Sequence, residues 1–161
     1  MDTISSEIVD ETYKRLGGMP PQEAPKMVNR MSKQQPLVLA YLMGTGHDIL
    51  NQDERELLLY LGIVVWQIMK QGTKSLPEIT EKILDKAEDS NMKMLEYLDD
   101  ESESGFIDTL EKIINNYNQP ETLRYIVEAL VEEPKEESMI RDENIGIMMI
   151  FLKTVIDSFD K

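Results

Sequence analysis

The 161-residue chain contains no cysteine. This absence excludes disulfide bonds, thiolate zinc sites, iron–sulfur clusters and cysteine nucleophiles, and it is compatible with a reducing cytosol. A long hydrophobic run is also missing, since the apolar stretch 57–69 is shorter than the ~20 residues that span a bilayer. The first seven residues are acidic and polar, unlike a secretory signal. We therefore expect a soluble, cytoplasmic protein.

Basic residues are scarce: 17 stand against 31 acidic ones, which gives a formal net charge of −14. Residues 1–44 contain five of each sign, so residues 45–161, with 12 bases and 26 acids, carry the whole excess. Nucleic-acid binding requires clustered Lys and Arg, and a field of this sign repels anionic lipid as well. We therefore expect neither nucleic acid nor membrane as a partner. If the acidity has a binding role, it favours a basic partner or a cation; otherwise it serves solubility.

Apolar side chains recur at helical spacing from Ile8 to Phe159, and no convincing alternation of apolar and polar residues indicates a strand. The segment from Leu57 to Trp66 is apolar on every side, which requires that other elements surround it. Asn51 and Glu54 form a capping box at its start. The sequence thus predicts an all-α protein, a single domain over residues 1–161. It is a bundle of seven to eight helices around a central apolar helix over about residues 52–71.

The other expected helices are separated by glycine, proline and short polar links. A second capping box, Ser75 with Glu78, is expected to open one of them, with a kink or break at Ser90–Asn91. The remaining helices are predicted near residues 8–16, 22–33, 36–43, 106–117, 123–131 and 145–159.

The segment 100–111 has the layout of a twelve-residue calcium loop. Asp100, Ser102, Ser104 and Asp108 stand at positions 1, 3, 5 and 9, with Gly105 at position 6 and Glu111 at position 12. Ca²⁺ prefers several oxygen ligands, a sharp turn at position 6 and a closing bidentate carboxylate. The segment resembles an EF-hand loop, and the resemblance implies Ca²⁺ as a ligand of these five oxygen-bearing side chains. The alternative is an acidic turn in which Ser102 or Ser104 caps the helix beginning near Phe106.

Lys26, Arg30 and Lys33 follow one ridge of the second predicted helix, at spacings of four and three. They form a cationic patch that could bind an acidic partner, a phosphate or the acidic part of a second copy. The alternative is a solvated helix face with Met27 and Met31 packed inward.

The chain has 11 methionines, and flexible thioethers suit both apolar binding grooves and helical cores. Met148 and Met149, next to Phe151, mark the place where we expect a partner groove. Core packing is the alternative at the same positions.

No recognisable catalytic motif is present, and the single histidine, His47, lies in a glycine-containing link between helices. We therefore predict a non-enzymatic, cytoplasmic interaction module, of the adaptor, chaperone-like or regulatory kind, that binds a protein partner through an apolar helical groove. Two alternatives stay open. One is a Ca²⁺-responsive protein using residues 100–111; the other is an enzyme that assembles scattered carboxylates with Tyr41, Tyr60 and His47. A homo-oligomer is also compatible with the uneven charge.

Overall fold

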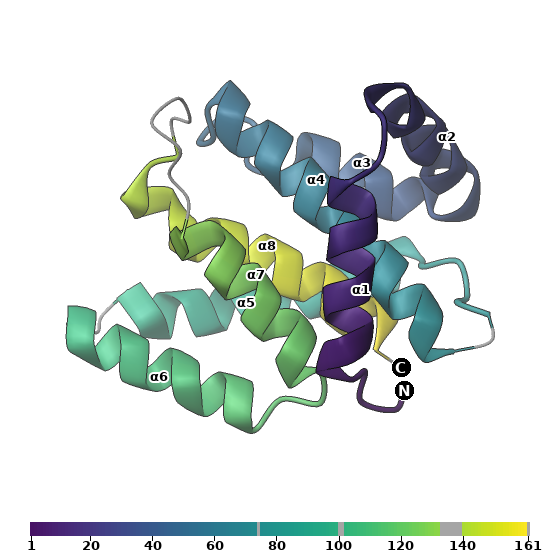
Figure 1. Ribbon diagram of the computed structural model, residues 1–161. Helices are drawn as coiled ribbons and strands as arrows, with labels where there is room; N and C mark the ends of the chain where they lie inside the picture. Colours follow the sequence, from purple (N-terminus) through teal and green to yellow (C-terminus); the bar gives the residue numbers. More distant parts are fainter. Residues whose placement is uncertain (74, 100–101, 133–139, 161) are drawn as a thin grey trace.

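The computed structural model of the protein describes residues 1–73, 75–99, 102–132 and 140–160 (Figure 1). These residues form eight α-helices and no strand, which confirms the predicted all-α class. The α-helices are α1 (Ser6–Gly17), α2 (Ala24–Gln34), α3 (Pro36–Gly44), α4 (Gln52–Met69), α5 (Glu81–Asp99), α6 (Glu103–Asn115), α7 (Pro120–Glu132) and α8 (Asp142–Phe159). Short 3₁₀ turns precede α2 (η1, Pro21–Glu23) and follow α4 (η2, Lys70–Gly72).

Two long helices, α4 and α8, run through the middle of the bundle. Helix α4 packs against α1, α2, α3, α7 and α8, and α8 packs against α4, α5 and α7. The prediction of a central apolar helix over residues 52–71 is thus confirmed. Helix α8 is even more enclosed, because 12 of its 18 residues are buried, polar ones among them.

The start of α4 is fixed by the predicted capping box. The side chain of Asn51 accepts a hydrogen bond from the Glu54 backbone N–H, and the Glu54 carboxylate accepts one from the Asn51 backbone N–H, both at 2.8 Å. Two backbone donors that the helix itself leaves unpaired are satisfied in this way.

The second predicted capping box, at Ser75 and Glu78, is wrong. Helix α5 begins at Glu81, and the hydroxyl of Thr80 accepts from the Ile83 N–H at 3.3 Å. The buried side chain of Gln35 holds the preceding residues in an extended path, since it donates to the Pro77 carbonyl and accepts from the Ile79 N–H. Tertiary hydrogen bonds therefore override the local cap. From Glu81 onward α5 runs without a break through residues 90–91.

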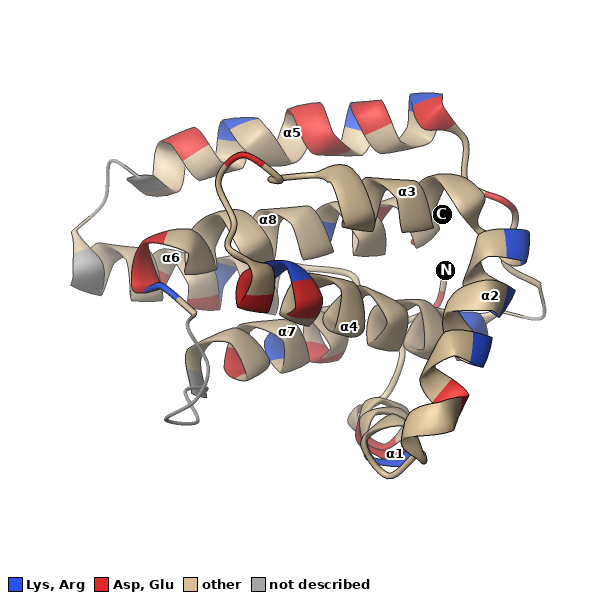
Figure 2. Ribbon diagram, turned by 90° about the horizontal axis from the view of Figure 1, so that it is seen from above, with Lys and Arg blue, Asp and Glu red and all other residues tan. Residues whose placement is uncertain are grey.

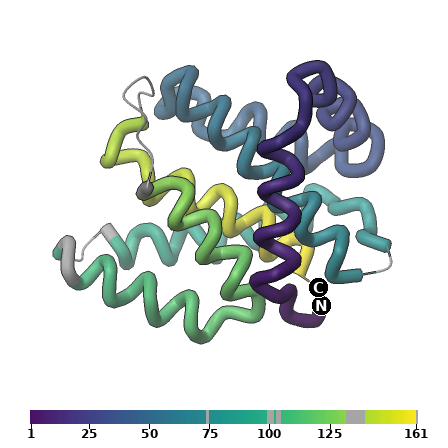
Figure 3. The backbone as a smooth tube through the Cα atoms, viewed as in Figure 1, coloured from purple at the N-terminus to yellow at the C-terminus, as the bar shows by residue number. Residues whose placement is uncertain are grey.

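The two ends of the chain lie side by side (Figure 3). The amino group of Met1 lies 4.0 Å from the Asp160 carboxylate. Between them, buried Gln119 donates to the Asp2 carbonyl and to Asp160, each at 2.9 Å, and accepts from the Ile4 N–H at 3.0 Å. Within the described residues, no helix combines the length and the apolar character that crossing a membrane requires.

Helices α3 and α4 approach closely at Gly62. A Cβ atom added there would lie 2.4 Å from a methyl carbon of Leu42 and 3.0 Å from its Cγ. Both residues are buried, so an added side-chain atom would have to displace the Leu42 side chain. The absence of a side chain at position 62 therefore sets how near α3 lies to α4.

We expect Gly62→Ala to lower the free energy of unfolding by about 1–3 kcal/mol, because the added methyl group overpacks a full interior. Urea unfolding followed by circular dichroism measures the change. Gly44→Ala is the matched control, since nothing lies within 4 Å of a Cβ atom at that position. Equal stability of the Gly62 variant and the control would contradict this account of the α3–α4 contact.

Candidate functional site

Two hollows lie next to each other on the outer face of α4. The first, the α2 hollow, has a volume of about 350 Å³ and an almost wholly apolar lining. Its outer wall consists of Leu16 at the end of α1, residues 19–21, and Ala24, Met27 and Val28 of α2. Its floor on α4 is formed by Glu56, Leu59, Tyr60, Ile63 and Val64.

The second hollow, the α3 hollow, has a volume of about 320 Å³. It is lined by Leu42 and Met43 of α3 and by Gln52, Arg55, Glu56 and Leu59 of α4. Glu56 and Leu59 line both hollows, so the two form a pair of adjacent depressions on α4. We call this pair of depressions the α4 groove.

The floor of the α4 groove is one stripe of a single helix. Its α4 residues stand at positions 52, 55, 56, 59, 60, 63 and 64, the spacing of one helix face. At ~1.5 Å per residue the stripe is about 18 Å long. Tyr60 on this stripe is 43% exposed, and Met43 on the α3 wall of the groove is 53% exposed. A partner of about three helical turns would cover this stripe.

Glycine and proline residues between α1 and α2 create the outer wall. Helix α1 ends at Gly17, and Gly18 forms its C-cap. Pro20 is extended, with φ −59° and ψ 147°, before Pro21 starts the short turn η1. Since proline cannot continue a helix, the chain turns away from α1 here and re-enters as α2 at a distance from α4. The gap left between α2 and α4 is the α2 hollow.

The predicted cationic patch lies on the outer surface of α2, and Lys26, Arg30 and Lys33 are all exposed (Figure 2). Lys26 pairs with Glu23 at 3.2 Å. Arg30 and Lys33 have no ion-pair or hydrogen-bond partner among the described residues. Met27 and Met31 pack inward, as the alternative interpretation of this helix expects.

The partner groove expected at Met148 and Met149 requires correction. These side chains are 0% and 3% exposed, and Phe151 beside them is buried as well. Helix α8 packs against α4, α5 and α7. The two methionines therefore belong to the core, and the apolar groove of this protein lies on α4 instead.

The five residues of the EF-hand-like segment are not brought together in the described part of the chain. Asp100 and the side chain of Ser104 lie outside it, whereas Ser102 caps α6 by accepting from the Gly105 N–H at 3.2 Å. Gly105 is helical and lacks the positive φ that position 6 of the loop requires. Asp108 and Glu111 lie exposed on α6. Calcium binding stays a prediction, and it would require the first turns of α6 to unwind.

Within the described residues, no group of three or more acidic or histidine side chains is placed to hold a metal ion. The scattered set proposed for an enzyme does not converge either. Tyr60 lines the α4 groove, whereas Tyr41 packs edge-on against Phe151 and His47 is exposed, next to Asp48. Burial and the nearby Glu88 carboxylate raise the pKa of Tyr41 well above its usual range.

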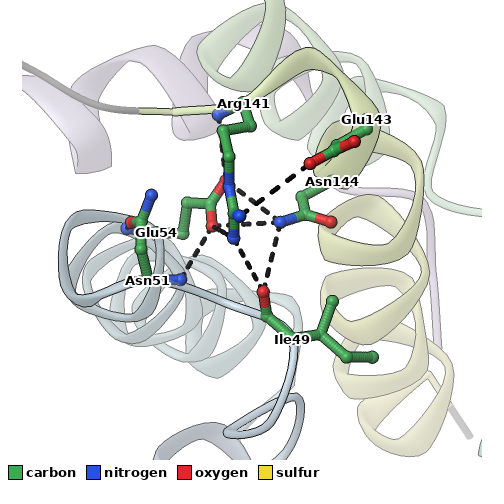
Figure 4. A network of polar contacts seen from close by, with 6 residues as sticks. All are labelled: Ile49, Asn51, Glu54, Arg141, Glu143 and Asn144. Atoms are coloured by element: carbon green, nitrogen blue, oxygen red, sulfur yellow. Dashed lines mark hydrogen bonds and ion pairs between the residues drawn. The ribbon is translucent and has the colours of Figure 1, made fainter.

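The described polar networks are closed structural clusters. At the starts of α4 and α8, the fully buried carboxylate of Glu54 accepts hydrogen bonds from Arg141 at 2.8 Å and from Asn144 at 3.0 Å (Figure 4). Arg141 also donates to the Ile49 carbonyl at 2.7 Å. Burial alone would raise the pKa of Glu54, but the hydrogen bonds from Arg141, Asn51 and Asn144 outweigh it and lower the pKa to about 2.

A second network lies between α5 and α8. The buried amine of Lys153 donates to Asn91 and to Asp157, each at 2.9 Å, and lies 4.8 Å from the ring centre of Tyr117. The Tyr117 hydroxyl donates to the other Asp157 oxygen, and burial together with this carboxylate raises the pKa of Tyr117 far above its usual range. None of these residues lines either hollow of the α4 groove. Their polar atoms satisfy one another, so the set holds two helices together.

The fold and the site define the class of the protein: an all-helical bundle with an apolar surface groove. No family model matches the chain, and comparisons with curated proteins and with solved structures found no match either. The functional assignment therefore depends on the geometry of the groove and on the charges around it.

We expect Glu54→Gln to lower the free energy of unfolding by about 2–3 kcal/mol at pH 7, because it removes the buried carboxylate that accepts hydrogen bonds from Arg141 and Asn144. The pKa of Glu54 is lower in the folded protein than its usual value of 4.5. Its contribution is therefore complete above pH 4.5 and declines as the pH falls towards 2.

The difference in unfolding free energy between wild type and Glu54→Gln, measured in urea from pH 7 to pH 2, should thus shrink on acidification. Glu56→Gln, two positions along the same helix at an exposed site, should show a small difference throughout. A difference for Glu54→Gln that stays constant down to pH 2 would contradict the lowered pKa.

Proposed function

We propose that this protein is a non-enzymatic interaction module whose α4 groove binds a helical segment of a protein partner. The observation that carries the proposal is the groove itself: two adjacent hollows that together follow about three turns of α4, with a mainly apolar floor that includes Leu59, Tyr60 and Ile63. An amphipathic helix fits such a floor because its own apolar residues recur at the same spacing.

The composition of the walls supports a helical occupant over a small polar ligand. A small polar ligand would need hydrogen-bonding groups in the lining to replace its contacts with water. In the α2 hollow, Glu56 and the Tyr60 hydroxyl are the only polar side-chain groups, and the remaining lining is aliphatic, methionine or proline. Methionine and proline walls, here at residues 19–21 and 27, give contact area with little directional demand.

Helix α3 extends this surface beyond the groove. The nine-residue helix contains no charged residue, although Leu37 and Met43 are 41% and 53% exposed. An exposed helix face normally carries charges. Its apolar outer face next to the α3 hollow is therefore consistent with a contact surface larger than the groove alone.

Tyr60→Glu should abolish partner binding, because it places a charge in the centre of the groove floor. It should not unfold the protein, because the Tyr60 side chain is already 43% exposed. The matched control is Tyr97→Glu on α5, where the tyrosine is 65% exposed and lies outside the groove. Tagged wild type and both variants are incubated with a native cell extract, and retained proteins are quantified by mass spectrometry. Melting temperatures confirm that both variants are folded.

The proposal expects proteins that wild type and Tyr97→Glu retain equally and that Tyr60→Glu loses at least tenfold, about 1.4 kcal/mol. Retention by all three forms alike would place the binding surface elsewhere. Loss of the same proteins from both variants would show that exposed apolar surface in general, and not the groove, binds them.

A further inference from the structure

The α4 groove lies beside α2 and α3, and we call this part of the bundle its basic end. Residues 12–44, which include the outer wall of the α2 hollow and the α3 side of the α3 hollow, contain five basic residues and one acidic residue. The rest of the chain contains 12 basic and 30 acidic residues. Figure 2 views this end: α2 carries blue segments, α3 carries no charge, and the acidic residues concentrate on other helices.

The basic side chains at this end are available to a ligand. Arg15 stands next to Leu16, which lines the α2 hollow, and Arg55 lines the α3 hollow directly. Both are exposed. Arg15, like Arg30 and Lys33, has no ion pair within the described residues. Their charges therefore act outward, towards whatever approaches the groove.

One acidic residue lies within the groove. Glu56 lines both hollows and accepts a hydrogen bond from Gln52 at 3.0 Å. A carboxylate of the occupant is unfavourable next to Glu56 and favourable near Arg55, which lines the α3 hollow. Arg30 and Lys33, on the outer face of α2, add a longer-range attraction. The charges along the two long edges of the groove thus differ. A bound helix therefore has one favoured rotation about its own axis.

We infer that the occupant of the α4 groove is an acidic amphipathic helix of about 12 residues in a partner protein. This inference rests on the proposed function and adds the chemistry of the partner. Its apolar residues, at spacings of three and four, fill the two hollows, and its acidic residues face the basic end of the bundle. The acidic remainder of the protein repels such a helix, so only the groove end attracts it.

Three synthetic helices test the inference. Each is 16 residues long with the same leucine stripe at positions i, i+3, i+4 and i+7, and the other face carries glutamate, glutamine or lysine. Binding to the full-length protein is measured by fluorescence anisotropy at 50 and 500 mM NaCl. The glutamate helix should bind at least tenfold more tightly than the lysine helix at low salt, and added salt should reduce this preference.

Two pairs of variants locate the effect. Arg30→Gln with Lys33→Gln should weaken the glutamate helix about fivefold and leave the glutamine helix unchanged. Lys86→Gln with Lys93→Gln, which removes the same charge from exposed positions on α5, should change neither. Tyr60→Glu should remove the binding of both helices, because it acts on the apolar floor.

Equal binding of the three helices would overturn the acidic preference and leave the groove function intact. Absence of any glutamate-helix binding would overturn the inference as well, whereas the groove function is decided separately by the extract experiment with Tyr60→Glu. A concentration-dependent dimer that Tyr60→Glu abolishes, seen by sedimentation, would show that a second copy is the occupant and would also overturn it.

Discussion

The buried carboxylate of Glu54 is the contact on which the arrangement of this bundle depends. It lies on α4 but accepts hydrogen bonds from Arg141 and Asn144 at the start of α8, so the two most enclosed helices are joined at one end. At the other end, Gln119 and Asp160 join the two chain termini. The Glu54 contact therefore fixes the start of α4 against the start of α8.

The groove follows from that placement. With one side of α4 held against α8 and another against α3 at Gly62, the stripe through Leu59 and Tyr60 faces outward. The Gly–Gly and Pro–Pro pairs between α1 and α2 hold α2 away from this stripe, and no other helix of the described residues covers it. The same apolar character that makes α4 a core helix therefore also gives its uncovered side an apolar surface.

The sequence predicts the helices well because apolar periodicity and caps are local properties. Asn51 with Glu54 opens a helix as expected, whereas Ser75 with Glu78 does not, because Gln35, distant in the chain, binds the residues in between. The groove could not be located in this way. Met148 and Leu59 both belong to apolar stripes, and only the packing of neighbouring helices decides that the first is enclosed and the second lines a hollow. The buried set around Lys153 was missed for the same reason, although lysine, threonine, aspartate and serine at 153, 154, 157 and 158 interrupt an otherwise apolar helix.

The basic residues of this protein can have two effects: they stabilise the fold by reducing its self-repulsion, and they attract an approaching acidic helix. Basic residues near an acidic body reduce its self-repulsion, and this stabilises any fold with a net charge of −14. That effect would be largest for bases paired closely with acids, as Arg141 is with Glu54. Arg30 and Lys33 instead lie on the outer face of α2 without such a partner in the described chain, where water screens their effect on stability. Their field extends about one Debye length, ~8 Å, into the solvent beside the groove, which is the distance over which it can act on an approaching helix.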